Sequence, residues 1–480
     1  MFNLAYILGA IRACRYDGFG ECRGDSCWAR ERKGKMASVR RAPKFPGPGP
    51  IAATLDVFLR DDGPVRLSRY ARTYGPVSSF LVYGQRVFLF DDAGAIEEVL
   101  VTKGRSFRKG VGLQRMRILL GDGLLTSEEP LHLERRRLVQ PAFHRKRLSS
   151  YARTMRRLSR GAMASWNDGE TRDLTMDMPP LTLAIASESL FGAAMNDDAA
   201  LVASAMSELM HLFPGMMGPL QPIRSRLPLP ETRRFERMRA NLDSAIARLI
   251  ETRRASADGG ADDVFGLLTN ARFDDGSQLD AMALRDELLT FILAGHETTS
   301  NALAWTLYLL ATHPEVQHAV AAEAYAADLD APDATLDEAL PHTRAVVKES
   351  MRLFPPAWAI GRMATERVEI GDAVLKRGDT VLLSPYVTQR NPRYFDRPDE
   401  FRPERWASAE TLPRFAYFPF GGGNRVCIGE PFAWMEAVIV LATLIREWRF
   451  APTPATSNDM LGLLTLRPER GMPLKIAPRR

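Results

Sequence analysis

One uninterrupted helical segment constrains the fold of this 480-residue chain more than any other feature. Residues 280–313 keep a helical apolar pattern, and Pro314 ends it because proline cannot continue a helix. At a rise of 1.5 Å per residue, such a helix is about 50 Å long. This length predicts a helix that crosses the whole molecule, with the other elements packed around it.

The middle of this helix carries a polar segment, residues 294–299, with the order Ala-Gly-His-Glu-Thr-Thr. An exposed Ser/Thr-rich face is one reading, but Phe291, Ile292 and Leu293 immediately before it favour burial. Threonine hydroxyls can bond to the preceding turn and bend a helix. The missing side chain of Gly295 leaves room for a group against the backbone.

A glycine-rich turn with a single cysteine precedes the last long apolar segment. Residues 420–429 read FGGGNRVCIG, and an amphipathic helical run follows over 431–448. Cys427 therefore lies where a helix begins, near free N–H groups and the positive end of the helix dipole. This position favours the thiolate, which is the metal-binding form of cysteine. The glycines permit close approach to a flat ligand, and Arg425 is placed to meet an anionic group of that ligand.

An isolated cysteine is usually a small buried hydrophobe, and three glycines are usually a loop. The spacing of Phe420, Gly423, Arg425, Cys427 and Gly429, Phe-x-x-Gly-x-Arg-x-Cys-x-Gly, resembles the haem-binding signature of the cytochrome P450 monooxygenases at every position. The resemblance implies that all five positions surround heme b, with the iron held by the Cys427 thiolate, whose electron donation favours O–O cleavage.

The polar helix segment resembles the oxygen-binding motif of the same family, Ala-Gly-x-Asp/Glu-Thr. The resemblance implies that Ala294 and Gly295 lie against the haem. It also implies two catalytic residues: Thr298 would hold the hydrogen-bond network of the oxygen site, and Glu297 would relay protons from solvent.

Two further motifs follow in the order of the family. Glu349-x-x-Arg352 places two charges on one helix face, and Pro403-Glu-Arg405 comes later. The resemblance implies that these residues lock together behind the haem and are critical for the fold rather than for catalysis.

Other basic residues match haem-propionate ligands of the family. His132 and Arg136 lie at i and i+4 on one predicted helix, and Arg362 follows a Pro-Pro turn. The alternative for the neighbouring arginines is an ordinary charged surface. A wider basic cluster could instead dock an acidic electron-transfer protein: Arg135, Arg137, Arg145, Lys146 and Arg147.

Charge and cysteine usage separate the N-terminus from the rest of the chain. The first 50 residues hold ten Lys or Arg against four Asp or Glu, which accounts for the whole net charge of +6. The basic balance is therefore no argument for nucleic acid. The apolar run at residues 2–11 is too short to span a bilayer. A single cysteine in the body favours a cytoplasmic protein. We expect residues 1–43 to be a disordered extension.

Local patterns predict the smaller elements. Residues 55–74 and 93–102 read as helices, 77–90 and 368–383 as β-hairpins, and 104–127 as a loop over a ligand. Leu461 to Leu466 should return towards the pocket. The Met-rich segment 206–220 is either core or a flexible lid over an apolar substrate.

These patterns predict a mainly α fold with small β-sheets (α+β), one cytochrome P450 domain over 44–480, of the bacterial soluble type, with the long helix over the haem. The implied reaction takes O₂ and two electrons from a separate ferredoxin and its reductase, and hydroxylates or epoxidises a hydrophobic molecule. A terpenoid is the first expectation. A fatty acid is the second, because a loop carries Arg105, Arg108 and Arg115. A peroxide-driven haem-thiolate enzyme and a haem sensor are the alternatives, and neither would need Glu297 and Thr298.

Overall fold

The computed structural model describes residues 45–59, 62–192, 229–255, 263–270, 278–330, 339–407 and 412–479, with a few single positions between 201 and 276. The predicted extension 1–43 and nearly all of the Met-rich segment 206–220 lie outside these residues. No helix of the described part of the chain is both long and apolar enough to cross a membrane.

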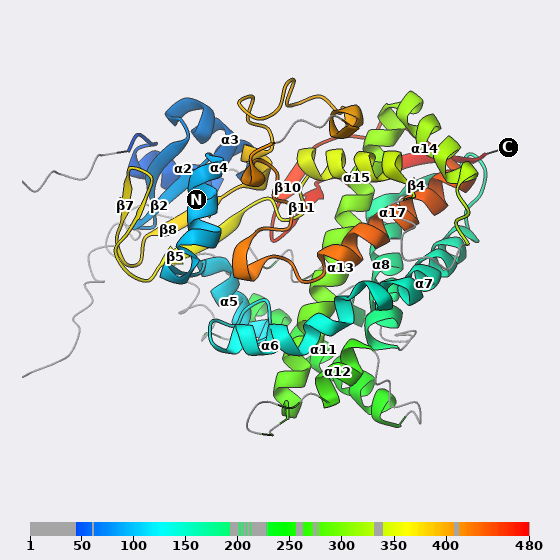
Figure 1. Cartoon of the computed structure of the whole chain (residues 1–480), viewed down its shortest axis with the longest axis horizontal. Coiled ribbons are helices and arrows are strands. Elements are labelled where there is room, and N and C mark those ends of the chain that lie inside the picture. The colour runs from blue at the N-terminus through cyan, green and yellow to red at the C-terminus, as the bar shows by residue number, and fades with distance from the viewer. Residues whose placement is uncertain are drawn as a thin grey trace, which may run out of the picture. The chain divides into compact units, whose positions relative to one another are not determined.

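Helices make up most of this part of the chain, and most of them lie to one side of the largest sheet (Figure 1). In chain order they are α2 Pro50–Leu59, α3 Gly63–Tyr74, α4 Ala93–Glu97, α5 Val111–Leu120, α6 Leu131–Val139, α7 Arg145–Met163, α8 Leu174–Phe191, α11 Pro230–Ala255, α12 Val264–Asn270, α13 Ala281–Thr312, α14 Pro314–Ala326, α15 Pro341–Leu353, α16 Pro385–Thr388 and α17 Glu430–Glu447. A short π-helix, Glu98–Thr102, continues α4.

The strands form four small sheets. The largest has the order β1 Val77–Val82, β2 Gln85–Phe90, β8 Thr380–Leu383, β5 Ile360–Ala364 and β3 Phe107–Lys109, in which only the β2–β8 pair is parallel. A second sheet has the order β4 Thr171–Asp173, β12 Pro473–Pro478 and β9 Trp448–Pro452. Two-stranded pairs are β6 Val368–Ile370 with β7 Ala373–Leu375, and β10 Met460–Gly462 with β11 Leu466–Pro468. The mainly α fold with small sheets is confirmed.

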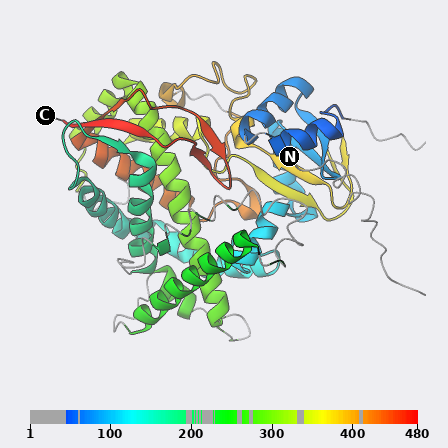
Figure 2. The same ribbon diagram turned by 180° about the vertical axis from the view of Figure 1, so that it is seen from behind.

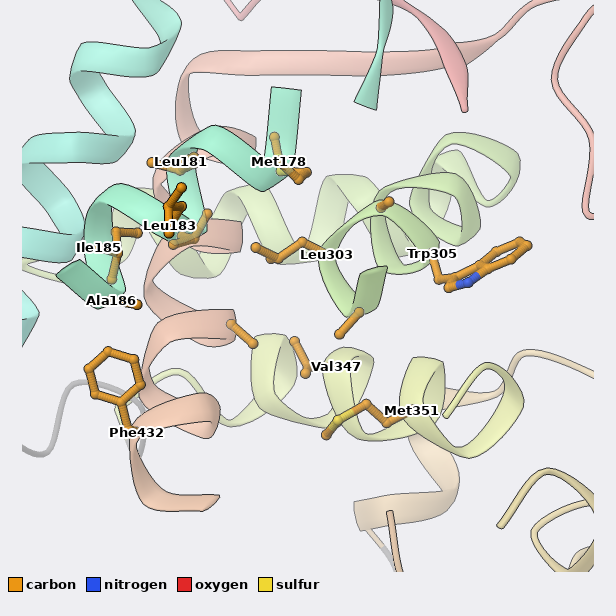
Figure 3. Packing of buried hydrophobic residues seen from close by; sticks show 14 of the residues in the cluster. Met178, Leu181, Leu183, Ile185, Ala186, Leu303, Trp305, Val347, Met351 and Phe432 are labelled. Atoms are coloured by element: carbon orange, nitrogen blue, oxygen red, sulfur yellow. The ribbon is translucent and has the colours of Figure 1, made fainter. Parts of the chain in front are cut away.

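Helix α13 is the predicted central helix, and its bounds confirm the prediction within one residue. Asp280 caps its first turn by accepting a hydrogen bond from the Ala283 N–H at 2.7 Å. Apolar side chains of α8, α15 and α17 surround it (Figure 3). Trp305 is fully buried and stacks on Phe354 with ring centroids 4.1 Å apart. The burial of α13 on most sides explains why its apolar residues are not confined to one stripe.

Several local predictions were wrong in informative ways. The predicted loop 104–127 contains strand β3 and helix α5, whose buried face is Met116, Leu119 and Leu120. The predicted helix 55–74 is divided into α2 and α3, with Pro64 in the first turn of α3. The hairpin 77–90 is confirmed as β1 and β2. The hairpin predicted at 368–383 ends at Leu375, because β8 pairs with β2 and β5 instead.

Candidate functional site

Cys427 lies in the turn that leads into α17. Its N–H donates to the Phe420 carbonyl at 3.0 Å, which closes the turn. The side chain has an exposed surface, yet burial by surrounding protein raises the pKa of the thiol to about 11. The exposed surface and the raised pKa are compatible if the side chain lines a space that is accessible but enclosed by protein. Hydrogen bonds from the N–H groups of Gly429 and Glu430 lower the pKa of the thiol, but by less than burial raises it.

The expectation that the helix N-terminus alone favours the thiolate is therefore wrong for the ligand-free chain. Desolvation disfavours the charged sulfur more than the first-turn N–H groups of α17 stabilise it. A metal ion reverses this balance, because a coordinating thiol loses its proton to the metal.

Two glycines of the turn pack closely against other parts of the chain. A Cβ on Gly423, whose φ is +68°, would lie 1.9 Å from the carbonyl oxygen of Leu100, and one on Gly422 would lie 2.4 Å from the Phe415 ring. The π-helix Glu98–Thr102, which contains Leu100, thus fits closely under the turn. Close packing within the chain explains these two glycines, and the predicted contact of Gly423 with a cofactor stays a prediction.

Phe143 connects the cysteine turn to α13. Its ring carbon Cε1 would lie 3.9 Å from a Cβ on Gly429, and its ring centroid lies 6.0 Å from that of Phe291. Phe291 is less than one turn of α13 before Ala294. The cysteine turn therefore adjoins the part of α13 in which the polar segment begins.

At the polar segment, one face of the otherwise buried helix α13 is accessible. Ala294 is exposed and Thr298, one turn later, is half-buried, whereas Leu293, His296 and Glu297 are buried. The Thr298 hydroxyl donates to the Ala294 carbonyl at 2.8 Å, as expected of a threonine in a helix. Accessible space therefore borders α13 at Ala294 and Thr298.

Gly295 faces α8 rather than this accessible face. A Cβ built on Gly295 would lie 3.3 Å from the Cβ of Ala186, which is tighter than ordinary contact. Thr182 of α8 also donates to the His296 carbonyl at 3.0 Å. The close approach of α8 explains the glycine (Figure 3), and a contact of Gly295 with a cofactor stays a prediction.

Glu297 is buried on a different side of α13 from Thr298. Its Oε1 accepts hydrogen bonds from the Thr465 hydroxyl at 2.8 Å and from the Asn301 Nδ2 at 3.1 Å. Asn301 Nδ2 also donates to the Thr465 hydroxyl oxygen at 3.1 Å. The predicted proton relay is thus held by a closed triangle of hydrogen bonds.

Four basic side chains from distant parts of the chain form a group that we call the cationic cluster: the buried Lys109, His132 and Arg362, and the partly buried Arg425. Burial, and then the charge of Arg425, lowers the pKa of Lys109 to about 7 and that of Arg362 to about 10. Burial, and then Lys109, lowers the pKa of His132 to about 4.

The cationic cluster contains a guanidinium N–H group that the nearby carboxylates do not take up among the described residues. Arg425 Nη2 pairs with Glu128, but its buried Nη1 has no hydrogen-bond partner among the described residues. Within the described part of the chain, Arg362 Nη1 donates to the Gly361 carbonyl alone, at 3.0 Å. His132 Nδ1 lies 3.1 Å from Glu129 Oε1. Buried cations without partners are unstable unless an anion binds them. The cluster therefore fits a ligand that carries carboxylates.

Arg136 has a different partner from His132, although both belong to α6. Its Nη1 donates to the Val426 carbonyl at 2.7 Å, directly before Cys427. Burial lowers the pKa of its guanidinium, and the Cys427 sulfur opposes this. Arg136 holds the cysteine turn in place, and its predicted contact with a propionate stays a prediction.

The predicted basic docking cluster is wrong for Arg135. Its side chain is buried, and Nη1 donates to Glu287 Oε1 of α13 at 2.8 Å. Arg147 is half-buried and its charge opposes the burial that raises the pKa of Asp263, and Arg137 is exposed. The side chains of Arg145 and Lys146 lie outside the described residues.

Sequence reasoning missed Lys109, Asn301 and Thr465. Asn301 follows Glu297 at i+4, so helical spacing could have found it. Lys109 and Thr465 meet their partners only through the fold: Thr465 is 168 residues from Glu297. A local pattern contains no signal for such pairs.

The sequence model described as cytochrome P450 matches residues 43–474. The chain is 32% identical over 462 residues to cyclooctatin synthase of Streptomyces melanosporofaciens, covering 94% of this chain and 98% of that protein. It is 31% identical over 394 residues to pentalenene oxygenase of Streptomyces avermitilis, covering 79% and 85%. The structure of retinoic acid bound cyanobacterial CYP120A1 shares its fold, with a TM-score of 0.80 at 24% identity over 91% of this chain and 100% of that chain. The chain therefore belongs to the cytochrome P450 family.

Proposed function

We propose that Cys427 ligates the haem iron of this cytochrome P450 monooxygenase and that its substrate is a terpenoid. Haem with a cysteine thiolate on the iron is the cofactor of the family, and Cys427 is the cysteine of the described part of the chain. The observation that carries the proposal is the accessible yet enclosed Cys427 side chain beside the opened face of α13.

The protein groups around this space fit the cofactor. Arg425 Nη1, which has no partner among the described residues, and the buried Arg362 would hold the two haem carboxylates. Phe420, which lies 5.7 Å from Trp434 between ring centroids, supports the cysteine turn from the side of α17. When bound, the haem supplies the activation of O₂.

Glu297 and Thr298 of α13 are placed to transfer protons. The Thr298 hydroxyl, hydrogen-bonded to Ala294, would donate into the accessible space after rotation about χ1. Glu297 uses Oε1 for Thr465 and Asn301, so its Oε2 accepts no hydrogen bond from the described residues and would bind water. This division of roles favours a monooxygenase over the peroxide-driven enzyme and the sensor, which need no proton delivery.

An uncharged terpenoid fits better than a fatty acid. Relatives are named cyclooctatin synthase, cyclooctat-9-en-7-ol 5-monooxygenase and pentalenene oxygenase. Arg105 and Arg108, two of the proposed carboxylate anchors, are exposed, and Arg108 Nη2 lies 3.0 Å from Met363 Sδ. The third, Arg115, is half-buried, and its charge opposes the burial that raises the pKa of Tyr83. These positions give a fatty-acid carboxylate little support.

Substrate binding tests the proposal directly. We would titrate the haem-loaded protein with pentalenene, a C16 fatty acid and the matching C16 alcohol, and follow the change in iron spin state. We would then assay oxidised products with a ferredoxin and its reductase. The proposal predicts a spin-state change and an oxygenated product with the hydrocarbon. Binding of the acid in preference to both the hydrocarbon and the alcohol would contradict it and favour the fatty-acid alternative.

A further inference from the structure

We propose that Thr465 is the positioning residue for Glu297, so that the strand pair β10–β11 controls proton delivery from α13. This inference rests on the proposed monooxygenase function and extends it to a residue outside the family motifs matched above. The supporting geometry is the hydrogen bond from the Thr465 hydroxyl to Glu297 Oε1, at 2.8 Å, within the triangle completed by Asn301.

The three residues of the triangle are buried. Glu297, Asn301 and Thr465 are 6%, 7% and 4% exposed, respectively. A hydrogen bond to a buried carboxylate contributes more than one in water, because the competing solvent is absent. Both partners act on the same oxygen, so one end of the carboxyl group is fixed and Oε2 is left for a water or a proton.

The backbone around Thr465 is fixed on both sides. The Trp358 indole N–H donates to the Leu463 carbonyl at 2.9 Å, and the Trp305 indole N–H donates to the Leu466 carbonyl at 3.2 Å. The Leu466 N–H in turn donates to the Pro356 carbonyl at 2.9 Å. The Thr465 hydroxyl therefore meets Glu297 with little freedom to move, which is the condition for precise positioning.

Two distant parts of the chain thus act as one unit. The C-terminal strands pass beside α13 when the molecule is seen from behind (Figure 2), and β11 contacts α13. Burial, and to a lesser extent the charge of Arg467 in β11, lowers the pKa of His296, the neighbour of Glu297. The segment that runs from Thr465 into β11 therefore brings both a hydroxyl and a positive charge to this part of α13.

The experiment compares Thr465→Val, which keeps the side-chain shape, with Thr465→Ser, which keeps the hydroxyl. Thr306→Val is the matched control, because Thr306 is also buried, lies on α13, and its hydroxyl bonds, among the residues that the structure describes, to the Ala302 carbonyl of its own helix alone. For each haem-loaded variant we would measure the peroxide released per electron pair consumed and the solvent deuterium isotope effect on product formation. Haem content and the reduced carbon monoxide spectrum establish that each variant is folded and loaded.

We expect Thr465→Val to lower product formation roughly tenfold, with more peroxide and a larger isotope effect. Thr465→Ser and Thr306→Val should stay close to wild type. In a Glu297→Ala background, Thr465→Val should add nothing further, because a positioning residue acts only through its partner.

Two results would overturn the inference, and they are distinguishable. If Glu297→Ala changes peroxide release and the isotope effect but Thr465→Val changes neither, Thr465 does not position the acid, and the proposed function is unaffected. If Glu297→Ala itself changes neither quantity, the proton role assigned to Glu297 in the proposed function is wrong, and the role of Thr465 fails with it.

Discussion

Two buried groups of charged side chains in this protein differ in how completely the chain satisfies them. In the Glu349 network, made of Glu349, Arg352, Arg405 and Trp406, all partners come from the chain. Arg352 is fully buried and uses every N–H of its guanidinium, on both Glu349 oxygens and on the carbonyls of residues 389, 398 and 400. In the cationic cluster, Arg425 Nη1 has no partner among the described residues.

The difference separates a structural site from a binding site. Glu349 also accepts hydrogen bonds from Arg405 Nε and Trp406 Nε1, both at 2.9 Å, which confirms the predicted lock between the Glu-x-x-Arg and Pro-Glu-Arg motifs. A buried network that is complete needs no ligand. A buried guanidinium N–H group without a partner is stabilised by an anion, and the family supplies one in haem.

The largest expected effect is in the Glu349 network. Glu349→Gln leaves Arg352 and Arg405 without an anionic partner, so we expect the free energy of unfolding to fall by about 3–5 kcal/mol. Urea unfolding measures this. Glu369→Gln is the control, because Glu369 is 57% exposed in its pair with Arg367 and should change stability by less than about 0.5 kcal/mol. Equal losses in the two variants would contradict the distinction.

Removing a charge from the cationic cluster, in contrast, should not lower the stability of the haem-free protein. Arg362→Met relieves repulsion from Arg425, so the haem-free chain should be no less stable than wild type. Haem affinity should fall about 10- to 100-fold, because a charged hydrogen bond to a carboxylate is lost. The rate of haem transfer to an accepting apoprotein measures this, with the exposed Arg367→Met as control. Unchanged haem transfer would remove Arg362 from the haem site.

Lys109 should give the haem-free protein a pH-dependent stability. Its pKa falls from 10.5 to about 7 in the folded chain, chiefly through burial. Between these two values the unfolded chain binds a proton that the folded chain lacks. The free energy of unfolding should therefore rise with pH, by at most about 1.4 kcal/mol per pH unit, and be flat below the folded pKa.

Unfolding of the haem-free protein across this pH range, in wild type and Lys109→Met, tests the prediction. The variant should lack the rise. Bound haem carboxylates should also suppress it, because they stabilise the charged lysine. An identical slope in wild type and variant would show that Lys109 keeps its charge in the folded chain.

The smallest effect concerns one hydrogen bond of the Glu349 network. Trp406→Phe removes the indole N–H but leaves Arg352 and Arg405 paired with Glu349, so the unfolding free energy should fall by only about 1–2 kcal/mol. Thermal unfolding of the haem-loaded protein is sufficient to measure this. A loss as large as that of Glu349→Gln would mean that the network depends on Trp406 rather than on charge.

The elements that the sequence predicted well carry their signals locally. The bounds of α13 follow from Asp280 at its start and Pro314 just beyond its end, and the β1–β2 hairpin follows from alternation around Gly84. Helix α5 was missed because its glycines and arginines hide a short buried face. The Cys427 turn was predicted as a site because its spacing resembles the haem-binding signature of the family.

The remaining parts of the site depend on distances that a sequence does not contain. The pKa of the Cys427 thiol was predicted in the wrong direction, because the degree of burial decides between desolvation and the helix N-terminus. Gly295 was assigned to a ligand, but the contact that explains it is with Ala186 of another helix. The triangle at Glu297 and the cationic cluster both join residues more than 100 positions apart.

The most direct test of the central claim is the visible spectrum of the reduced protein under carbon monoxide, for wild type and Cys427→Ser. We predict a Soret band strongly shifted to the red from that of histidine-ligated haem in the wild type, and its loss in the variant. A histidine-type spectrum in folded, haem-loaded wild type, or an unchanged red-shifted band in Cys427→Ser, would contradict the assignment of Cys427 as the ligand.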